Sequence, residues 1–203
     1  MRVAAEIGAM RAAGVALVVG LLGRSTPPRR ELEVPQRHVG RLQAEQLAAA
    51  GRTSIGYAYP DDDRVRIFAE PRLAGTRTAC AARGLAEPSV RTVPLDPDAA
   101  AVAVRAWRDE GVTGVCAYND DVALAVLAGM RRLGLRAPAD LAVIGVDDIP
   151  AARLAVPALT TVTTDQAAVA AHLAATVLAA IHGRPAPPAD LTELVEIVHR
   201  DSA

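Results

Sequence analysis

Three groups of carboxylate, amide and guanidinium side chains come shortly after apolar, β-branched runs of the sequence. The groups are Tyr118-Asn119-Asp120-Asp121, Asp147-Asp148, and Asp61-Asp62-Asp63 with Arg72 beyond it. A carboxylate can accept hydrogen bonds from two neighbouring hydroxyl groups, an arginine donates in a fixed fork, and an asparagine both donates and accepts. Together these side chains have the chemistry to bind a polyhydroxylated small molecule.

Each group also has a purely structural explanation. Asn119 or Asp120 can cap the helix that follows, and Arg72 can lie along the surface at the start of another helix. Asp147-Asp148 can form a solvent-exposed turn, and residues 61–63 a solvent-exposed loop. The side-chain types alone leave both explanations open.

The elements that must position these groups repeat in one pattern. An amphipathic stretch rich in Ala, Leu and Arg ends at a glycine, and a β-branched apolar run follows it. The expected helices are 1–13, 37–50, 72–83, 97–110 and 121–133, and the expected strands are 15–19, 54–58, 90–93, 114–118 and 141–146. Glycine suits the residue after a helix because that residue often adopts the left-handed conformation. Short apolar strands that alternate with helices predict an α/β fold, with a parallel sheet covered on both faces.

The pattern changes after Val146. A turn-rich passage over 149–157 leads into an extended Thr-rich run over 159–164. A helix is expected to begin at Asp165, which is a good N-cap, and to end at Gly183, before a Pro-rich loop and a last strand over 191–198. In open parallel sheets, ligands bind at the carboxyl ends of the strands, which is where the polar groups lie.

The composition excludes several classes of protein. The chain has 203 residues, of which 51% are hydrophobic, and its 22 basic and 23 acidic side chains give a net charge of −1. A disordered chain would combine low hydrophobicity with high net charge, and a surface made for nucleic acid or anionic membranes would be basic. The longest apolar run, 12–22, is shorter than the ~20 residues that span a bilayer. The N-terminus also lacks the unbroken apolar stretch of a signal peptide, so we expect a cytoplasmic protein with no membrane partner.

Signatures of catalysis and of cofactor binding are missing from the sequence. The histidines are scattered, the two cysteines lie in no metal-binding motif, and no GxSxG, Walker or GxGxxG sequence occurs. We therefore expect no catalytic residue, no metal ligand and no cofactor. Asp147-Asp148 could hold Mg²⁺ for phosphoryl transfer, but the chain contains no lysine to accompany them. An enzyme of that kind stays as the third alternative, behind two kinds of binding protein.

A series of ordered motifs carries a resemblance to a known family. The motifs are 48–57 (AAAGRTSIGY), 72–75 (RLAG), 117–124 (AYNDDVAL), 138–148 (PADLAVIGVDD), 157–162 (PALTTV) and, near the end, 199–202 (HRDS). From about Val34 onward, the chain resembles the effector-binding core of lactose-repressor (LacI) family transcriptional regulators, which share the fold of periplasmic sugar-binding proteins.

The resemblance implies two Rossmann-like subdomains with parallel sheets, as in class I periplasmic-binding-protein-like folds, the first of them incomplete. Residues 1–52 and 165–188 would form part of the N-terminal subdomain, and residues 54–160 and 191–203 the C-terminal subdomain. An incomplete first subdomain would leave an unpaired strand edge and uncovered apolar surface. We therefore expect an aggregation-prone monomer unless a partner chain covers that surface.

In the family, a small effector, often a sugar or a nucleoside, binds in the cleft between the subdomains and shifts their closure. That motion is relayed to a helix-turn-helix headpiece on operator DNA. Carried over by motif, the effector contacts are Arg72, Asn119 and Asp147, with Tyr118 beside them and Gln166 on the other subdomain. The resemblance thus implies a DNA-binding repressor in its full-length form, a cytoplasmic homodimer with a sugar as the expected effector.

Departures from the family pattern limit this expectation. Residues 16–19 continue as a strand instead of a recognition helix, so operator DNA is a partner only through a headpiece missing here. Where the family usually has Asp, before the helix 37–50, the sequence reads Val34-Pro35-Gln36. Aromatic residues make up only 2%, and Tyr118 and Trp107 are the nearest rings for stacking on a sugar. The alternative is a solute-binding protein with no DNA role, against which the missing signal peptide argues.

Overall fold

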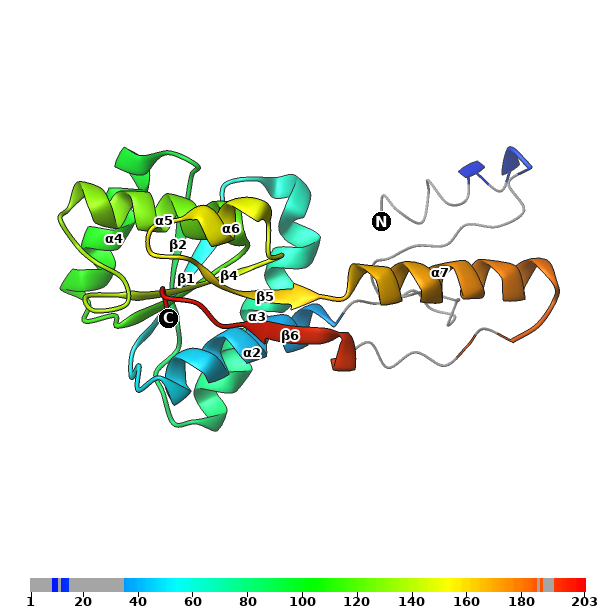
Figure 1. Ribbon diagram of the computed structural model, residues 1–203, viewed down its shortest axis with the longest axis horizontal. Helices are drawn as coiled ribbons and strands as arrows, with labels where there is room; N and C mark the ends of the chain where they lie inside the picture. The colour runs from blue at the N-terminus through cyan, green and yellow to red at the C-terminus, as the bar shows by residue number, and fades with distance from the viewer. Residues whose placement is uncertain (1–8, 11, 15–34, 186, 188–191) are drawn as a thin grey trace. The chain divides into compact units, whose positions relative to one another are not determined.

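The structure is a computed structural model that describes residues 9–10, 12–14, 35–185, 187 and 192–203. Helices and strands alternate along the chain, as the repeated pattern predicts (Figure 1). The helices are α2 (Gln36–Ala49), α3 (Arg66–Ala82), α4 (Pro97–Asp109), α5 (Asp120–Arg132), α6 (Pro150–Leu154) and α7 (Gln166–Ile181), with short 3₁₀ turns η1 (Asp63–Val65) and η2 (Thr192–Leu194). The strands are β1 (Ile55–Pro60), β2 (Ser89–Val93), β3 (Gly114–Ala117), β4 (Ala142–Val146), β5 (Thr160–Thr164) and β6 (Val195–Val198). The strand expected over 15–19 and most of the helix expected over 1–13 lie outside the described residues.

The strands form one mostly parallel sheet in the order β2-β1-β3-β4-β5-β6. Each of β1 to β5 runs parallel to its neighbours among them, whereas β6 pairs with β5 in the antiparallel sense, with Thr164 opposite Val195. Parallel neighbours need crossover connections, which α3, α4 and α5 supply between β1, β2, β3 and β4. The carboxyl ends of β1, β3 and β4 consequently lie at one edge of the sheet. The predicted α/β class is confirmed.

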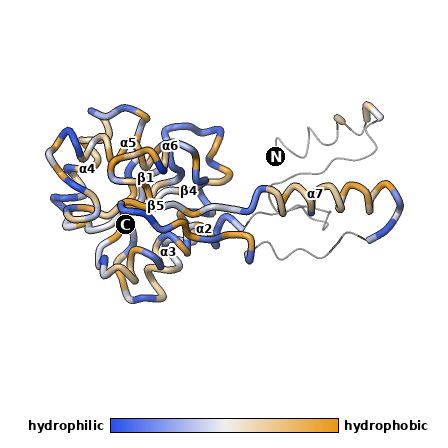
Figure 2. The backbone as a smooth tube through the Cα atoms, in the orientation of Figure 1, coloured by the Kyte–Doolittle hydropathy of each residue, from blue (hydrophilic) through white to orange (hydrophobic). Residues whose placement is uncertain are grey.

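Helices cover both faces of the sheet, with α4 and α5 on one side and α2 and α3 on the other (Figure 1). In β3, Val115 packs with Trp107 and Met130 in the first of two hydrophobic clusters. The next residue, Cys116, packs on the opposite face with Leu47. Figure 2 shows hydrophobic residues gathered where these helices meet the sheet. This alternation is what a sheet buried on both faces requires.

The chain divides into two compact units. One comprises residues 35–164 and 195–203, and the other comprises residues 1–34 and 165–194. The larger unit contains the whole sheet and the helix α2, although the sequence placed residues 35–52 in the other subdomain. In the structure α2 groups with the sheet because it packs against α3 and against one face of the sheet. The identity of the two units with the two expected subdomains stays a prediction.

The packing of α2 on α3 depends on two glycines. A Cβ atom on Gly40 would lie 1.9 Å from the backbone oxygen of Arg72, and a Cβ atom on Gly75 would lie 1.9 Å from the backbone oxygen of Arg37. Thr76 strengthens the contact, since its hydroxyl donates to the Gly40 carbonyl at 3.1 Å. Below this contact, the Gln43 side-chain amide donates to the carbonyl of Ala117 at 2.8 Å and so attaches α2 to the end of β3. The backbones of the two helices therefore touch directly.

The helix α7 belongs to the smaller unit. It begins where the Asp165 carboxylate accepts a hydrogen bond from the Ala168 backbone N–H at 2.9 Å, which confirms the predicted N-cap. Figure 2 shows that α7 is hydrophobic over most of its length, yet Leu178 and Ile181 are 56% and 66% exposed. Among the helices described, none has both the length and the apolar composition needed to cross a membrane.

Replacing Gly40 with alanine should destabilise the larger unit, because the added methyl group meets backbone atoms of α3 that cannot rotate away. We expect the free energy of unfolding, measured by urea denaturation with circular dichroism, to fall by about 3 kcal/mol, the upper end of the usual range for overpacking. Arg41→Ala is the matched control, since the Arg41 side chain is 48% exposed and its two contacts, a 3.9 Å ion pair with Glu45 and a 2.9 Å hydrogen bond with the His38 ring, lie at the surface. Equal losses in the two variants would show that the helices are not in tight contact.

Candidate functional site

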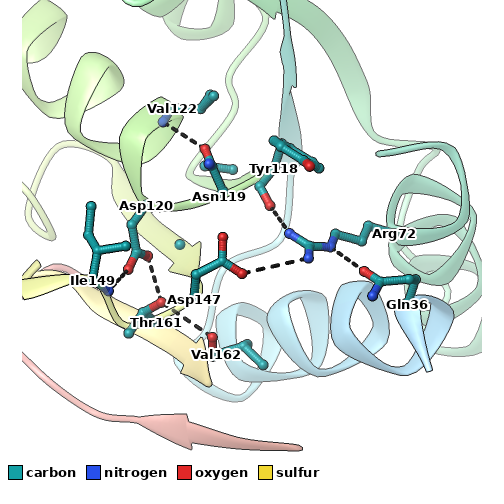
Figure 3. A network of polar contacts seen from close by, with 12 residues as sticks. Gln36, Arg72, Tyr118, Asn119, Asp120, Val122, Asp147, Ile149, Thr161 and Val162 are labelled. Carbon is teal, nitrogen blue, oxygen red and sulfur yellow. Dashed lines mark hydrogen bonds and ion pairs between the residues drawn. The ribbon is translucent and has the colours of Figure 1, made fainter. Parts of the chain in front are cut away.

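Arg72 lies at the centre of the candidate site, on the helix α3. Its side chain is only 8% exposed, and three groups fix it in place. The guanidinium donates through Nε to the Gln36 side-chain oxygen at 2.6 Å and through Nη1 to the Tyr118 backbone oxygen at 2.6 Å (Figure 3). The guanidinium carbon also lies 4.9 Å from the centre of the Tyr118 ring, a distance suited to a cation–π contact. The explanation of Arg72 as a surface arginine is therefore wrong.

Asp147 is the acidic residue beside the Arg72 guanidinium. One of its carboxylate oxygens lies 3.7 Å from Nη2 of Arg72, and its side chain is 45% exposed. Tyr118 follows β3 and Asp147 follows β4, and these two strands are neighbours in the sheet. The structure thus brings Arg72, Tyr118 and Asp147 together at the carboxyl edge of the sheet (Figure 3). Asp147 is the most exposed of the three. A hydroxyl group that approached here would meet an acceptor in Asp147 and donors in Arg72.

Asn119 has a structural role that the sequence left open. Its side-chain oxygen accepts a hydrogen bond from the Val122 backbone N–H at 3.0 Å, so Asn119 and not Asp120 is the N-cap of α5 (Figure 3). This capping satisfies one of the free N–H groups at the start of the helix. The side chain is partly buried, and its amide NH₂ group is the part that remains to donate to a ligand.

Asp120 is a buried carboxyl group whose environment sequence reasoning missed. It accepts hydrogen bonds from the Thr161 hydroxyl at 2.6 Å and from the Ile149 backbone N–H at 2.9 Å (Figure 3). Burial raises the pKa of Asp120 to about 6, although both hydrogen bonds favour the charged form. Gly145 makes room for it, since a Cβ atom there would lie 2.1 Å from an Asp120 carboxyl oxygen. A glycine inside the apolar run 141–146 was the available signal.

Asp148 has a partner from the far end of the chain. Its carboxylate lies 2.5 Å from Nη2 of Arg200, and the two side chains are 22% and 15% exposed. The sequence suggested a solvent-exposed turn for Asp147-Asp148, and for Asp148 that explanation is wrong. No local sequence pattern predicts this ion pair, because 52 positions separate Asp148 from Arg200.

Other residues singled out from the sequence lie outside this group. Gln166 is the exposed first residue of α7, in the smaller unit. Trp107 is fully buried in the core, where its ring N–H donates to the Ser89 backbone oxygen at 3.0 Å, so it cannot stack on a ligand. Asp62 caps the turn η1 and pairs with Arg64, in agreement with the loop explanation for 61–63. In the part of the chain that the structure describes, no cluster of His, Cys, Asp or Glu could hold a metal ion.

The buried Asp120 predicts an unusual dependence of stability on pH. Its pKa of about 6 lies above the ordinary value of 3.8, so the folded state binds a proton that the unfolded state lacks between those values. The contribution of Asp120 to stability therefore rises as the pH falls through 6, and it is lost as the pH rises above 6. We expect the wild type to gain about 1 kcal/mol relative to Asp120→Asn between pH 7 and pH 5 in urea denaturation. Parallel pH curves for the two proteins would contradict the burial of an ionisable group here.

Three kinds of comparison relate the chain to known proteins. The family model for the periplasmic binding protein-like domain matches residues 44–203. The chain is 28% identical to the HTH-type transcriptional regulator GntR of Pseudomonas aeruginosa, with 82% of this chain and 49% of that protein covered. It is 31% identical to the HTH-type transcriptional regulator reg1 of Streptomyces lividans, with coverage of 79% and 48%. The chain thus spans about half the length of the curated relatives that it matches.

Solved structures show the same fold. The crystal structure of a sugar-binding LacI-family regulator from Escherichia coli, in complex with phosphate, matches with a TM-score of 0.81 at 22% identity, over 98% of this chain and 72% of that one. The complex of the transcriptional regulator CelR with cellobiose matches with a TM-score of 0.77 at 27% identity, over 96% and 61%. These relatives are regulators and not enzymes, in agreement with the expectation of binding rather than catalysis. The chain therefore belongs to the periplasmic binding protein-like domain family, and it corresponds to the effector-binding core of LacI-family transcriptional regulators.

Proposed function

We propose that this chain is the effector-sensing core of a LacI-type transcriptional repressor, and that its effector is a neutral sugar. The observation that carries the proposal is the buried Arg72 with Asp147 at the carboxyl edge of the sheet, 3.7 Å apart. Asp147 would accept from sugar hydroxyl groups, while Arg72 and the amide of Asn119 would donate to sugar oxygens. Tyr118 would hold Arg72 in place, and a contact from Gln166 stays a prediction from the family resemblance.

The local charge favours a neutral ligand over an anionic one. Asp147 and Asp148 add to burial in raising the pKa of Asp120, and Asp121 adds to burial in raising the pKa of Asp147. Asp120 is therefore repelled by Asp147 and Asp148, and Asp147 by Asp121, while Arg72 lowers the pKa of Asp147 and offsets part of this repulsion. Arg72 and Arg200 are each already paired with a carboxylate. A sugar phosphate or a sugar acid would add a negative charge to this surface, which a neutral sugar does not.

The aromatic residues favour a sugar over a nucleoside. A nucleobase gains much of its binding energy from stacking on an aromatic ring. Trp107 lies inside the core, and the Tyr118 ring packs against the Arg72 guanidinium. Polar contacts to hydroxyl groups are therefore the main attraction that this surface offers.

The role in transcription follows from the relatives and extends beyond this chain. Relatives with this domain are named HTH-type regulators, so we propose that the whole protein is cytoplasmic, binds operator DNA through a helix-turn-helix and dimerises. The net charge of −1 gives this chain little affinity for DNA on its own. The alternative of a solute-binding protein is not favoured, because the curated relatives are regulators.

A thermal-shift screen with cellobiose, galactose, glucose 6-phosphate and adenosine tests the proposed effector class. A neutral sugar at 100 times its Kd should stabilise the fold by about 2.7 kcal/mol, and the other two should not. Asp147→Asn should weaken the binding of that sugar at least about tenfold in calorimetry, because a charged acceptor is lost. Asp109→Asn, on the exposed end of α4, is the matched control and should bind normally.

Two results would count against this function. Stabilisation by glucose 6-phosphate alone would exclude the neutral-sugar proposal. If Asp147→Asn bound the sugar with unchanged affinity, the sugar would not bind at the carboxyl edge of the sheet.

A further inference from the structure

The turn that carries Asp147 has an unusual backbone. Asp147 has a φ of +105° and Asp148 a φ of +49°, and neither residue is glycine. Side-chain-bearing residues seldom adopt positive φ, and such a conformation persists only where surrounding contacts hold it. The contacts that hold this turn therefore determine where the Asp147 carboxylate points.

One end of the turn is attached to the sheet. The Asp147 backbone N–H donates to the Val162 carbonyl of β5 at 2.8 Å. This bond fixes the backbone of Asp147 but not that of the next residue. The bond from the Ile149 backbone N–H to Asp120 fixes the residue after the turn, which leaves Asp148 to be held through its side chain.

Arg200 holds the side chain of Asp148. Besides its 2.5 Å contact with Asp148, its guanidinium donates through Nη1 to the Leu159 carbonyl at 2.8 Å. Its backbone N–H donates to the Thr160 hydroxyl at 3.0 Å, so Arg200 is itself held against the start of β5. A charge-assisted hydrogen bond between two mostly buried groups is strong and directional. The turn is thus held from β5 at Asp147 and from the C-terminal segment at Asp148, while the residue after it, Ile149, donates its backbone N–H to Asp120 of α5.

We propose that the Arg200–Asp148 pair is a positioning device that sets the affinity of the site for its effector. Each of the two adjacent carboxylates has its own arginine: Asp148 has Arg200, and Asp147 has Arg72. With Asp148 held by Arg200, the backbone of the turn leaves Asp147 facing Arg72. Without that pair, the positive-φ turn relaxes and the Asp147 carboxylate leaves its position beside Arg72. This inference rests on the proposed function, because it assigns the pair a role in sugar binding.

The C-terminal segment offers a matched control. Ser202 also attaches this segment to the sheet, since its hydroxyl donates to the Val143 carbonyl at 2.7 Å and accepts from the Thr160 N–H at 2.8 Å. These bonds do not involve the turn. Ser202→Ala therefore weakens the docking of the segment without touching Asp148, whereas Arg200→Gln and Asp148→Asn remove the pair.

Two readouts test the proposal on folded protein. The first is the backbone NMR chemical shifts of Asp147 and Asp148, which report positive φ and need no ligand. The second is calorimetric titration with cellobiose, or with galactose where cellobiose does not bind. We expect Arg200→Gln and Asp148→Asn to move the shifts of the turn and to weaken sugar binding about tenfold, which corresponds to 1.4 kcal/mol. Arg200→Lys keeps the charge and should restore most of the affinity, and Ser202→Ala should keep both the shifts and the affinity.

The outcomes separate this inference from the proposed function. If Arg200→Gln left the backbone chemical shifts of Asp147 and Asp148 unchanged, the positioning role would be overturned, regardless of the sugar affinity of that variant. A change of these chemical shifts in Arg200→Gln without a loss of sugar affinity would overturn it as well. So would a loss of affinity in Ser202→Ala as large as the loss in Arg200→Gln. Moved shifts in a protein whose wild type binds neither sugar would support the hold of Arg200 on the turn and would count against the proposed effector class.

Discussion

A guanidinium that leaves water must find partners for its charge and its N–H groups, and burying Arg72 imposes this requirement on much of the larger unit. Its partners come from the start of α2 (Gln36), from the end of β3 (Tyr118) and from the turn after β4 (Asp147). If any of these segments moved away, the buried Arg72 guanidinium would lose a partner for its charge or for one of its N–H groups. Gly40 and Gly75 are part of the same requirement, because the direct contact of α2 with α3 keeps Gln36 beside Arg72.

The buried carboxyl groups extend this arrangement away from Arg72. Asp120 ties the start of α5 to β5 and to the residue before α6, and Asp148 ties the end of β4 to the C-terminal segment. Each is satisfied by hydrogen bonds, as buried polar groups must be. The carboxyl edge of the sheet is consequently a set of interlocked polar contacts, in which the half-exposed Asp147 has the freedom to meet a ligand.

The elements of this fold were largely predictable from sequence, because they depend on local signals. Gly51 and Gly134 end their helices with φ of +80° and +69°, as expected of a residue after a helix. Boundaries set by packing were harder: α3 begins at Arg66 instead of Arg72, with Pro71 inside it, because Ala69 packs into the core. Arg72, Tyr118 and Asp147 could be selected because strand ends are recognisable. Gln36, the partner of Arg72, and Arg200, the partner of Asp148, could not be selected, because those contacts join residues 36 and 52 positions apart.

The antiparallel pairing of β5 with β6 makes residues 165–194, the second segment of the smaller unit, an insertion in the sequence of the larger one. The chain leaves the sheet at Thr164 and re-enters it at Val195, and these two residues face each other across the ladder. The Asp165 backbone N–H also bonds to the Leu194 carbonyl at 2.9 Å, so the two connecting segments start as a paired ribbon. A two-residue Asn-Gly turn in place of residues 165–194 would close β5 and β6 into an ordinary hairpin. Starting such a chain at Pro35 as well would leave the residues of the larger unit alone, with Arg72, Asp147 and Arg200 among them and the strand order unchanged.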